Sequence, residues 1–106
     1  KSDYQGKLAI IFQGENVQLK DTEQEKLDKV AIKLLDEPDQ RLQLVAYATT
    51  ASENASVARR LSLLRALEIR NILIKKGVSA TTMSVRALGD RVKSDPPNRV
   101  DIIMTK

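Results

Sequence analysis

The chain contains no cysteine and no histidine, and these two absences remove several classes of function at once. Without cysteine no disulfide can form, and without histidine the commonest general base and metal ligand are missing. Zinc sites of the usual kind and Ser-His or Cys-His nucleophiles are therefore excluded. Acidic residues are numerous but dispersed along the chain. We expect a protein that is not an enzyme and that carries no metal and no cofactor.

Aromatic residues and long apolar runs are also scarce. Aromatics make up 3% of the 106 residues, so unpaired bases would find no stacking platform, and nucleic acid is disfavoured as a partner. The formal net charge of +4 permits an anionic partner without requiring one. No apolar run approaches the roughly 20 residues that a membrane-spanning helix needs. We therefore expect no transmembrane segment in this chain.

Short apolar runs and helical patterns alternate along the sequence. Apolar runs at residues 7–12, 42–48, 83–88 and 100–104 are typical of strands. The order predicts a single α+β domain over residues 1–106, β-α-β-α-β-β, with two helices packed on one face of a small mixed sheet. We expect the last two strands to pair as a hairpin across a long loop, which includes a rigid turn at residues 95–98.

Both helical patterns have recognisable ends. The first begins near Asp21 or Thr22, either of which is expected to cap the helix, and it ends before Pro38. Thr22 and Glu25 also have the spacing of a capping box. The second runs from about residue 55 to 76 and ends at Gly77, a usual position for a helix-terminating glycine.

Arg65 lies on the apolar face of the second helical pattern. Leu61 is four residues before it and Ile69 four residues after it, so all three share one stripe. One interpretation is structural: the aliphatic stem lies on apolar surface while the charged head reaches water. The other is that the guanidinium binds a carboxylate, either an internal one, such as Glu68 or Asp101, or one that belongs to a ligand.

The residues around Arg65 resemble a known family. The stretch Leu61-Ser62-x-x-Arg65-Ala66 is similar to the "LSxxRA" signature of the OmpA-like (OmpA/MotB/Pal) domain. The segments "LQLVAYATT", "NILIKKGVSATTMSVRALGD" and "PNRVDIIM" also resemble its second strand and loop, its helix end and third strand, and its closing strand. The resemblance extends from Leu8 to Met104, in the same order of elements.

This resemblance implies noncovalent binding of peptidoglycan. In the family, an arginine at the position of Arg65 takes a carboxylate of diaminopimelate in the stem peptide, and an aspartate after the second strand takes the ammonium. The domain would be the periplasmic part of a larger bacterial cell-envelope protein, tethered to a membrane through residues outside this chain. The implied peptidoglycan-binding residues are Arg65, Thr49, Thr50, Ser62 and Arg99.

The sequence departs from the family pattern at the acidic half of the site. Thr49 or Thr50 stands where the aspartate is expected, and Glu53 is the only acid in the loop, where it also suits the first turn of a helix. Ala58 replaces a common asparagine, and a doubled arginine is reduced to Arg99. The alternative hypothesis is therefore an OmpA-like scaffold that has lost peptidoglycan binding and serves protein–protein assembly, for example through Leu63 and Leu64.

Overall fold

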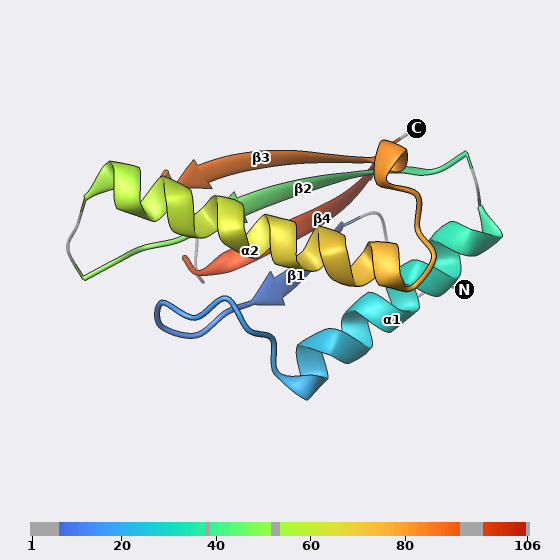
Figure 1. Ribbon diagram of the computed structural model, residues 1–106, viewed down its shortest axis with the longest axis horizontal. Coiled ribbons are helices and arrows are strands. Elements are labelled where there is room, and N and C mark those ends of the chain that lie inside the picture. Colours follow the sequence, from blue (N-terminus) through green and yellow to red (C-terminus); the bar gives the residue numbers. More distant parts are fainter. Residues whose placement is uncertain (1–6, 38, 52–53, 92–96, 106) are drawn as a thin grey trace.

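The computed structural model describes residues 7–37, 39–51, 54–91 and 97–105, and it confirms the predicted order of elements. Both helices lie on the same face of a four-stranded mixed sheet (Figure 1). Glu53 and the first two residues of the predicted turn at residues 95–98 lie outside the described residues. The elements are β1 (Lys7–Ile11), α1 (Asp21–Asp36), β2 (Arg41–Tyr47), α2 (Ala55–Lys75), the 3₁₀ turn η1 (Ala80–Thr82), β3 (Met83–Gly89) and β4 (Arg99–Thr105).

The strand order in the sheet is β1-β4-β2-β3, so the predicted hairpin between the last two strands is wrong. β4 lies between β1 and β2 and is antiparallel to both, whereas β2 and β3 are parallel neighbours. Residues 90–98 separate β3 from β4, which is longer than the about two to five residues of a tight hairpin. The long connection allows β4 to occupy the centre of the sheet, where it pairs along both edges.

The hydrophobic core fills the space between the sheet and the two helices. Alternation along β4 points Val100 and Ile102 into this core and turns Arg99 and Asp101 toward the other face. The helices bury stripes at helical spacing, as their sequences predict. Core residues include Ile10, Leu27, Val30, Leu34, Leu44, Ile69, Leu73, Val100 and Ile102.

The start of α1 is tied to the end of β1 by a buried carboxylate. The predicted side-chain cap is wrong: Lys20 is the N-cap residue, and it makes no side-chain capping bond. Instead, Glu23 in the first turn accepts hydrogen bonds from the Ile11 main-chain N–H at 2.8 Å and from Lys26 Nζ at 3.0 Å. Burial raises the pKa of Glu23, but these hydrogen bonds outweigh it and hold the pKa below its usual value.

Glu23→Gln is expected to lower the free energy of unfolding by about 1–2 kcal/mol at pH 7, because the charge-assisted bonds are lost. The folded-state pKa lies below the unfolded value of 4.5, so the contribution of Glu23 is fully present above that pH. It disappears as the pH falls through the folded-state pKa. Urea denaturation of both proteins at pH 7 and pH 3 measures this. A stability gap that is equal at both pH values contradicts the assignment.

Candidate functional site

Arg65 is fully buried on the inner face of α2, and its guanidinium is held by the chain itself. Nε donates to the Asn16 carbonyl at 2.8 Å, and Nη2 donates to the Gly14 carbonyl at 2.7 Å. Nη1 donates to Asn98 Oδ1 at 2.7 Å. These three bonds go to neutral oxygens, not to the two acids that the sequence suggested. Arg65 therefore anchors the β1–α1 loop and the start of β4 to α2.

The buried guanidinium keeps its charge at neutral pH. Burial lowers the pKa of Arg65 to about 10, while the nearby Glu15 carboxylate opposes that shift. The guanidinium carbon lies 4.9 Å from the centre of the Phe12 ring, in a cation–π contact. A positive charge is thus fixed behind the ends of β1 and β2, with hydrogen bonds and an aromatic face compensating for the water it has lost.

Asn98 connects Arg65 to the end of β2. Its Oδ1 accepts from Arg65 Nη1 and also from the Thr49 main-chain N–H at 3.0 Å. Its Nδ2 donates to Thr49 Oγ1 at 3.1 Å. Its main-chain carbonyl accepts from the Phe12 N–H at 2.9 Å. One amide therefore joins the ends of β1 and β2 and the start of β4 to the buried charge.

Ser62 makes a second tie, between α2 and the end of β3. Its buried hydroxyl donates to the Arg59 carbonyl at 2.8 Å and accepts from the Gly89 N–H at 3.1 Å. Gly89 has a positive φ of 59°, and a Cβ placed there would lie 2.9 Å from the Arg59 nitrogen. Only glycine fits this close approach without strain. Its carbonyl accepts from the Ala48 N–H at 2.8 Å, so Gly89 also meets the end of β2.

A pocket of about 200 Å³ lies beside the contacts that Asn98 makes with Thr49 and that Ser62 makes with Gly89. It is lined by Thr49, Thr50, Ala58 and Asp90. Ala58 and Ser62 are one turn apart on α2, and Asp90 directly follows Gly89, so the lining residues come from the ends of β2 and β3 and the first half of α2. Figure 1 shows where these three elements lie in the fold. We call it the strand-end pocket. Its wall carries hydroxyls, a methyl group and one carboxylate.

The five residues implied by the resemblance are not all in this pocket. Thr49 and Thr50 line it, Arg65 reaches it through Asn98, and Ser62 shapes it from behind. Arg99 lies on the other face of the sheet: its Nε donates to Asp101 Oδ1 at 3.1 Å, and its guanidinium carbon lies 4.6 Å from the centre of the Tyr47 ring.

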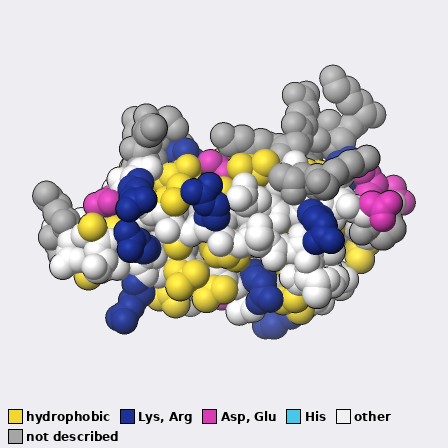
Figure 2. All heavy atoms as spheres, turned by 90° about the horizontal axis from the view of Figure 1, so that it is seen from above, with side chains coloured by type: hydrophobic (Ala, Val, Ile, Leu, Met, Phe, Trp, Pro, Cys, Tyr) yellow, Lys and Arg dark blue, Asp and Glu magenta, His cyan; other side chains and the backbone are white. Residues whose placement is uncertain are grey.

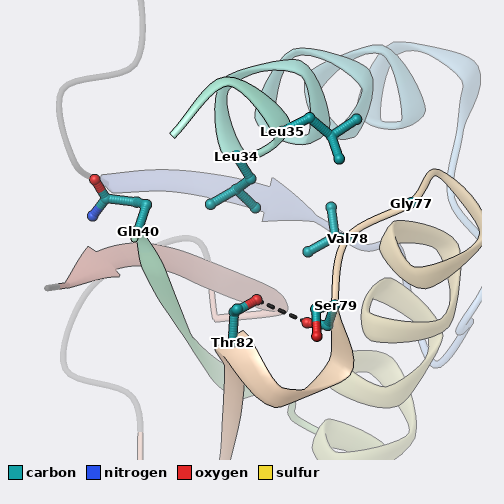
Figure 3. Close-up of a pocket in the computed structure, with 7 residues that line it drawn as sticks. All are labelled: Leu34, Leu35, Gln40, Gly77, Val78, Ser79 and Thr82. Atoms are coloured by element: carbon teal, nitrogen blue, oxygen red, sulfur yellow. Dashed lines mark hydrogen bonds between the residues drawn. The ribbon is translucent and has the colours of Figure 1, made fainter. Parts of the chain in front are cut away.

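A second hollow lies at the opposite end of the molecule. It has a volume of about 170 Å³, and Figure 3 shows it between the end of α1 and the segment that follows α2. The lining is largely apolar and carries no ionisable side chain, and the Thr82 hydroxyl within it donates to the Ser79 carbonyl at 2.8 Å. The residues are Leu34, Leu35, Gln40, Gly77, Val78, Ser79 and Thr82. This hollow therefore offers a charged ligand no ionised partner, in contrast to the strand-end pocket.

A family model for the OmpA family matches residues 11–100, which is most of the chain. The chain belongs to the OmpA family. This confirms the predicted family and, with it, the predicted class of domain. In the described part of the chain, no helix is long and apolar enough to cross a membrane.

Solved OmpA-like structures have the same fold at low sequence identity. The OmpA-like domain of FopA1 from Francisella tularensis superposes with a TM-score of 0.82 at 15% identity, covering 93% of this chain and 73% of that one. The peptidoglycan-associated lipoprotein from Burkholderia pseudomallei gives 0.78 at 19%, covering 92% and 89%. The C-terminal domain of MotB from Helicobacter pylori gives 0.75 at 15%, covering 92% and 84%. No curated protein sequence matches the chain.

Sequence reasoning missed two residues of this site. Asn98 was interpreted as part of a turn, and Asp90 received no role. The signal for Asn98 was its place directly before Arg99, at the start of a strand where the family often carries a doubled arginine. Asp90 carried no such signal, because only the parallel pairing of β3 with β2 brings the residue after Gly89 to the end of β2. Ends of parallel strands meet at one edge of a sheet.

Asn98→Ala is expected to lower the free energy of unfolding by about 1.5–3 kcal/mol, because a buried Arg65 donor loses its acceptor. Asn98→Asp keeps an oxygen at the same place and adds a charge opposite the guanidinium. It should therefore be clearly more stable than the alanine variant at pH 7. Chemical denaturation of the three proteins measures the order. If alanine and aspartate destabilise the domain equally, the bond to Arg65 is not what makes Asn98 important.

Proposed function

We propose that this domain binds the peptide stems of peptidoglycan noncovalently, with the strand-end pocket as the site. The ligand would be the zwitterionic end of a diamino acid such as diaminopimelate. Arg65 supplies the positive charge that attracts its carboxylate, and Thr49 and Thr50 supply hydroxyls at the pocket wall. Ser62 and Arg99 serve the site indirectly, Ser62 by holding β3 against α2 and Arg99 by holding the outer face of β4.

One observation carries this proposal. The OmpA signature arginine is retained as a charged, buried group, and its hydrogen bonds lead through Asn98 to Thr49 at the pocket. Burying a guanidinium costs free energy when its three hydrogen bonds all go to neutral oxygens and none to a carboxylate. The cost is understandable if the charge also acts on a ligand at the pocket.

The surface charge of the domain favours the same partner. Lys and Arg side chains are spread over the face shown in Figure 2, with few acidic side chains among them. Exposed Arg59 and Arg60 lie on α2, near the pocket residue Ala58. Stem peptides carry free carboxylates, so a positive surface should raise the rate of encounter with the wall. This long-range attraction should weaken with salt, whereas binding in the pocket should persist.

The proposed location is the periplasm. Among the similar structures are MotB domains from Helicobacter pylori described as periplasmic, and the Burkholderia pseudomallei protein is described as a lipoprotein. By analogy, residues 1–106 would be one domain of a larger envelope protein, tethered to a membrane by residues outside this chain.

Thr49→Asp is expected to bind a diaminopimelate-containing stem peptide about tenfold or more tightly than wild type. A carboxylate at this position can accept the bond that Asn98 Nδ2 now gives to Thr49 Oγ1. It can also make a charge-assisted bond to the ligand ammonium, worth about 1.5–3 kcal/mol, or one to two decades of affinity. Calorimetric titration with the peptide, beside a thermal melt, measures both affinity and folding.

Two variants control this experiment. Thr50→Asp tests whether the neighbouring threonine occupies the position instead, and Thr81→Asp adds the same charge in η1, away from the pocket. Wild type should also sediment with purified peptidoglycan sacculi and remain bound at moderate salt. Equal affinities for wild type and both pocket variants, all folded, would remove the pocket from the proposal. Arg65→Ala is a poor test, because losing its three bonds should unfold the surrounding loops.

The assembly alternative is favoured by one observation. Val57, Leu63 and Leu64 on α2 are 45%, 40% and 48% exposed, which is unusual for large apolar side chains on one helix. If this surface drives self-association, Leu63→Lys should convert an oligomer to a monomer. Under the peptidoglycan proposal, both proteins should sediment as monomers at high concentration in analytical ultracentrifugation. A wild-type oligomer that the substitution disperses, together with absent binding to sacculi, would make assembly the better function.

A further inference from the structure

Among the residues that the structure describes, Asp90 is the only ionisable one that lines the strand-end pocket. Its side chain is exposed, and it is in none of the salt bridges that join described residues. A carboxylate at a pocket wall that forms no ion pair with its described neighbours attracts cationic groups from solution. The hydroxyls of Thr49 and Thr50 add oxygen acceptors to the same wall. This combination suits an ammonium group, which brings one positive charge and several N–H donors.

The fold places Asp90 there with little freedom. The preceding residue, Gly89, is fixed on three sides: its N–H by Ser62 Oγ, its carbonyl by the Ala48 N–H, and its Cα by the close backbone of Arg59. The main chain therefore leaves β3 in a defined direction, next to the first half of α2. A side chain carried by such a fixed turn loses less conformational entropy on binding than one on a free loop.

The two charged groups of the site come from different elements of the fold. The guanidinium of Arg65 lies behind Thr49, to which it is joined by Asn98, and the carboxylate of Asp90 comes from the end of β3. A ligand that carries a carboxylate and an ammonium on one carbon can orient between them. The positive group is buried and the negative group is exposed, so the ammonium would be bound closer to water.

We propose that Asp90 is the acid that binds the ammonium of the ligand, in place of the aspartate that position 49 lacks. The inference rests on the proposed peptidoglycan function and makes its site more specific: the ligand must present a free side-chain amine. A ligand end that carries only a carboxylate would use half of the site. In this proposal the acid comes from the end of β3, the parallel neighbour of β2.

The test compares wild type, Asp90→Asn and Asp90→Glu by calorimetric titration with a stem peptide that contains diaminopimelate. Asp90→Asn is expected to weaken binding about three- to tenfold, a smaller effect than at position 49 because Asp90 is more exposed to water. Asp90→Glu should recover part of the affinity. Asp39→Asn, which removes an exposed acid in the turn before β2, should bind as wild type does. Thermal melts establish that each variant is folded.

A second peptide, in which the side-chain amine is acetylated, tests whether Asp90 recognises the positive charge of that amine. Wild type should bind it more weakly, and Asp90→Asn should bind it no worse than wild type does. If the aspartate and asparagine proteins bind the unmodified peptide equally while wild type still sediments with sacculi, the Asp90 assignment is overturned and the peptidoglycan function stands. If wild type binds neither peptide nor sacculi, the Asp90 assignment and the peptidoglycan function are both contradicted.

Discussion

The arrangement of the binding end depends on one buried guanidinium. Arg65 contributes three hydrogen bonds that join α2 to the β1–α1 loop and to the start of β4. Without it, the Gly14 and Asn16 carbonyls would lose this donor, and Asn98 Oδ1 would keep only the Thr49 N–H. The loop, the strand end and the helix are therefore positioned together, and the pocket is formed by their relative placement.

The signature of the family has a clear physical meaning in this chain. Ser62 and Arg65 lie about one helical turn apart on the inner face of α2, and each hydrogen-bonds to a different strand end. Ser62 holds the end of β3, and Arg65 holds the start of β4 through Asn98. The motif thus works first as a clamp that shapes a pocket, and the charge of Arg65 adds an electrostatic preference for anionic groups.

Asn98 and Thr49 explain how the site can lack the usual acid and still be well ordered. The amide of Asn98 both donates and accepts, so it satisfies Arg65 Nη1, the Thr49 N–H and the Thr49 hydroxyl together. A neutral pair therefore completes the hydrogen bonds at this end of the network without adding a second buried charge. The acidic character of the pocket comes instead from Asp90, whose position depends on the close approach of Gly89 to α2.

The sequence by itself determined the order of elements, the inner face of each helix and the family, because periodicity and the Leu-Ser-x-x-Arg-Ala motif are local properties of the chain. It did not determine that β4 lies between β1 and β2, since strand pairing depends on contacts between distant segments. For the same reason, the partners of Arg65 were decided only by tertiary structure: Gly14, Asn16 and Asn98 are 51, 49 and 33 residues away. Asp90 likewise reaches the pocket only because parallel strands end side by side, which no local pattern records.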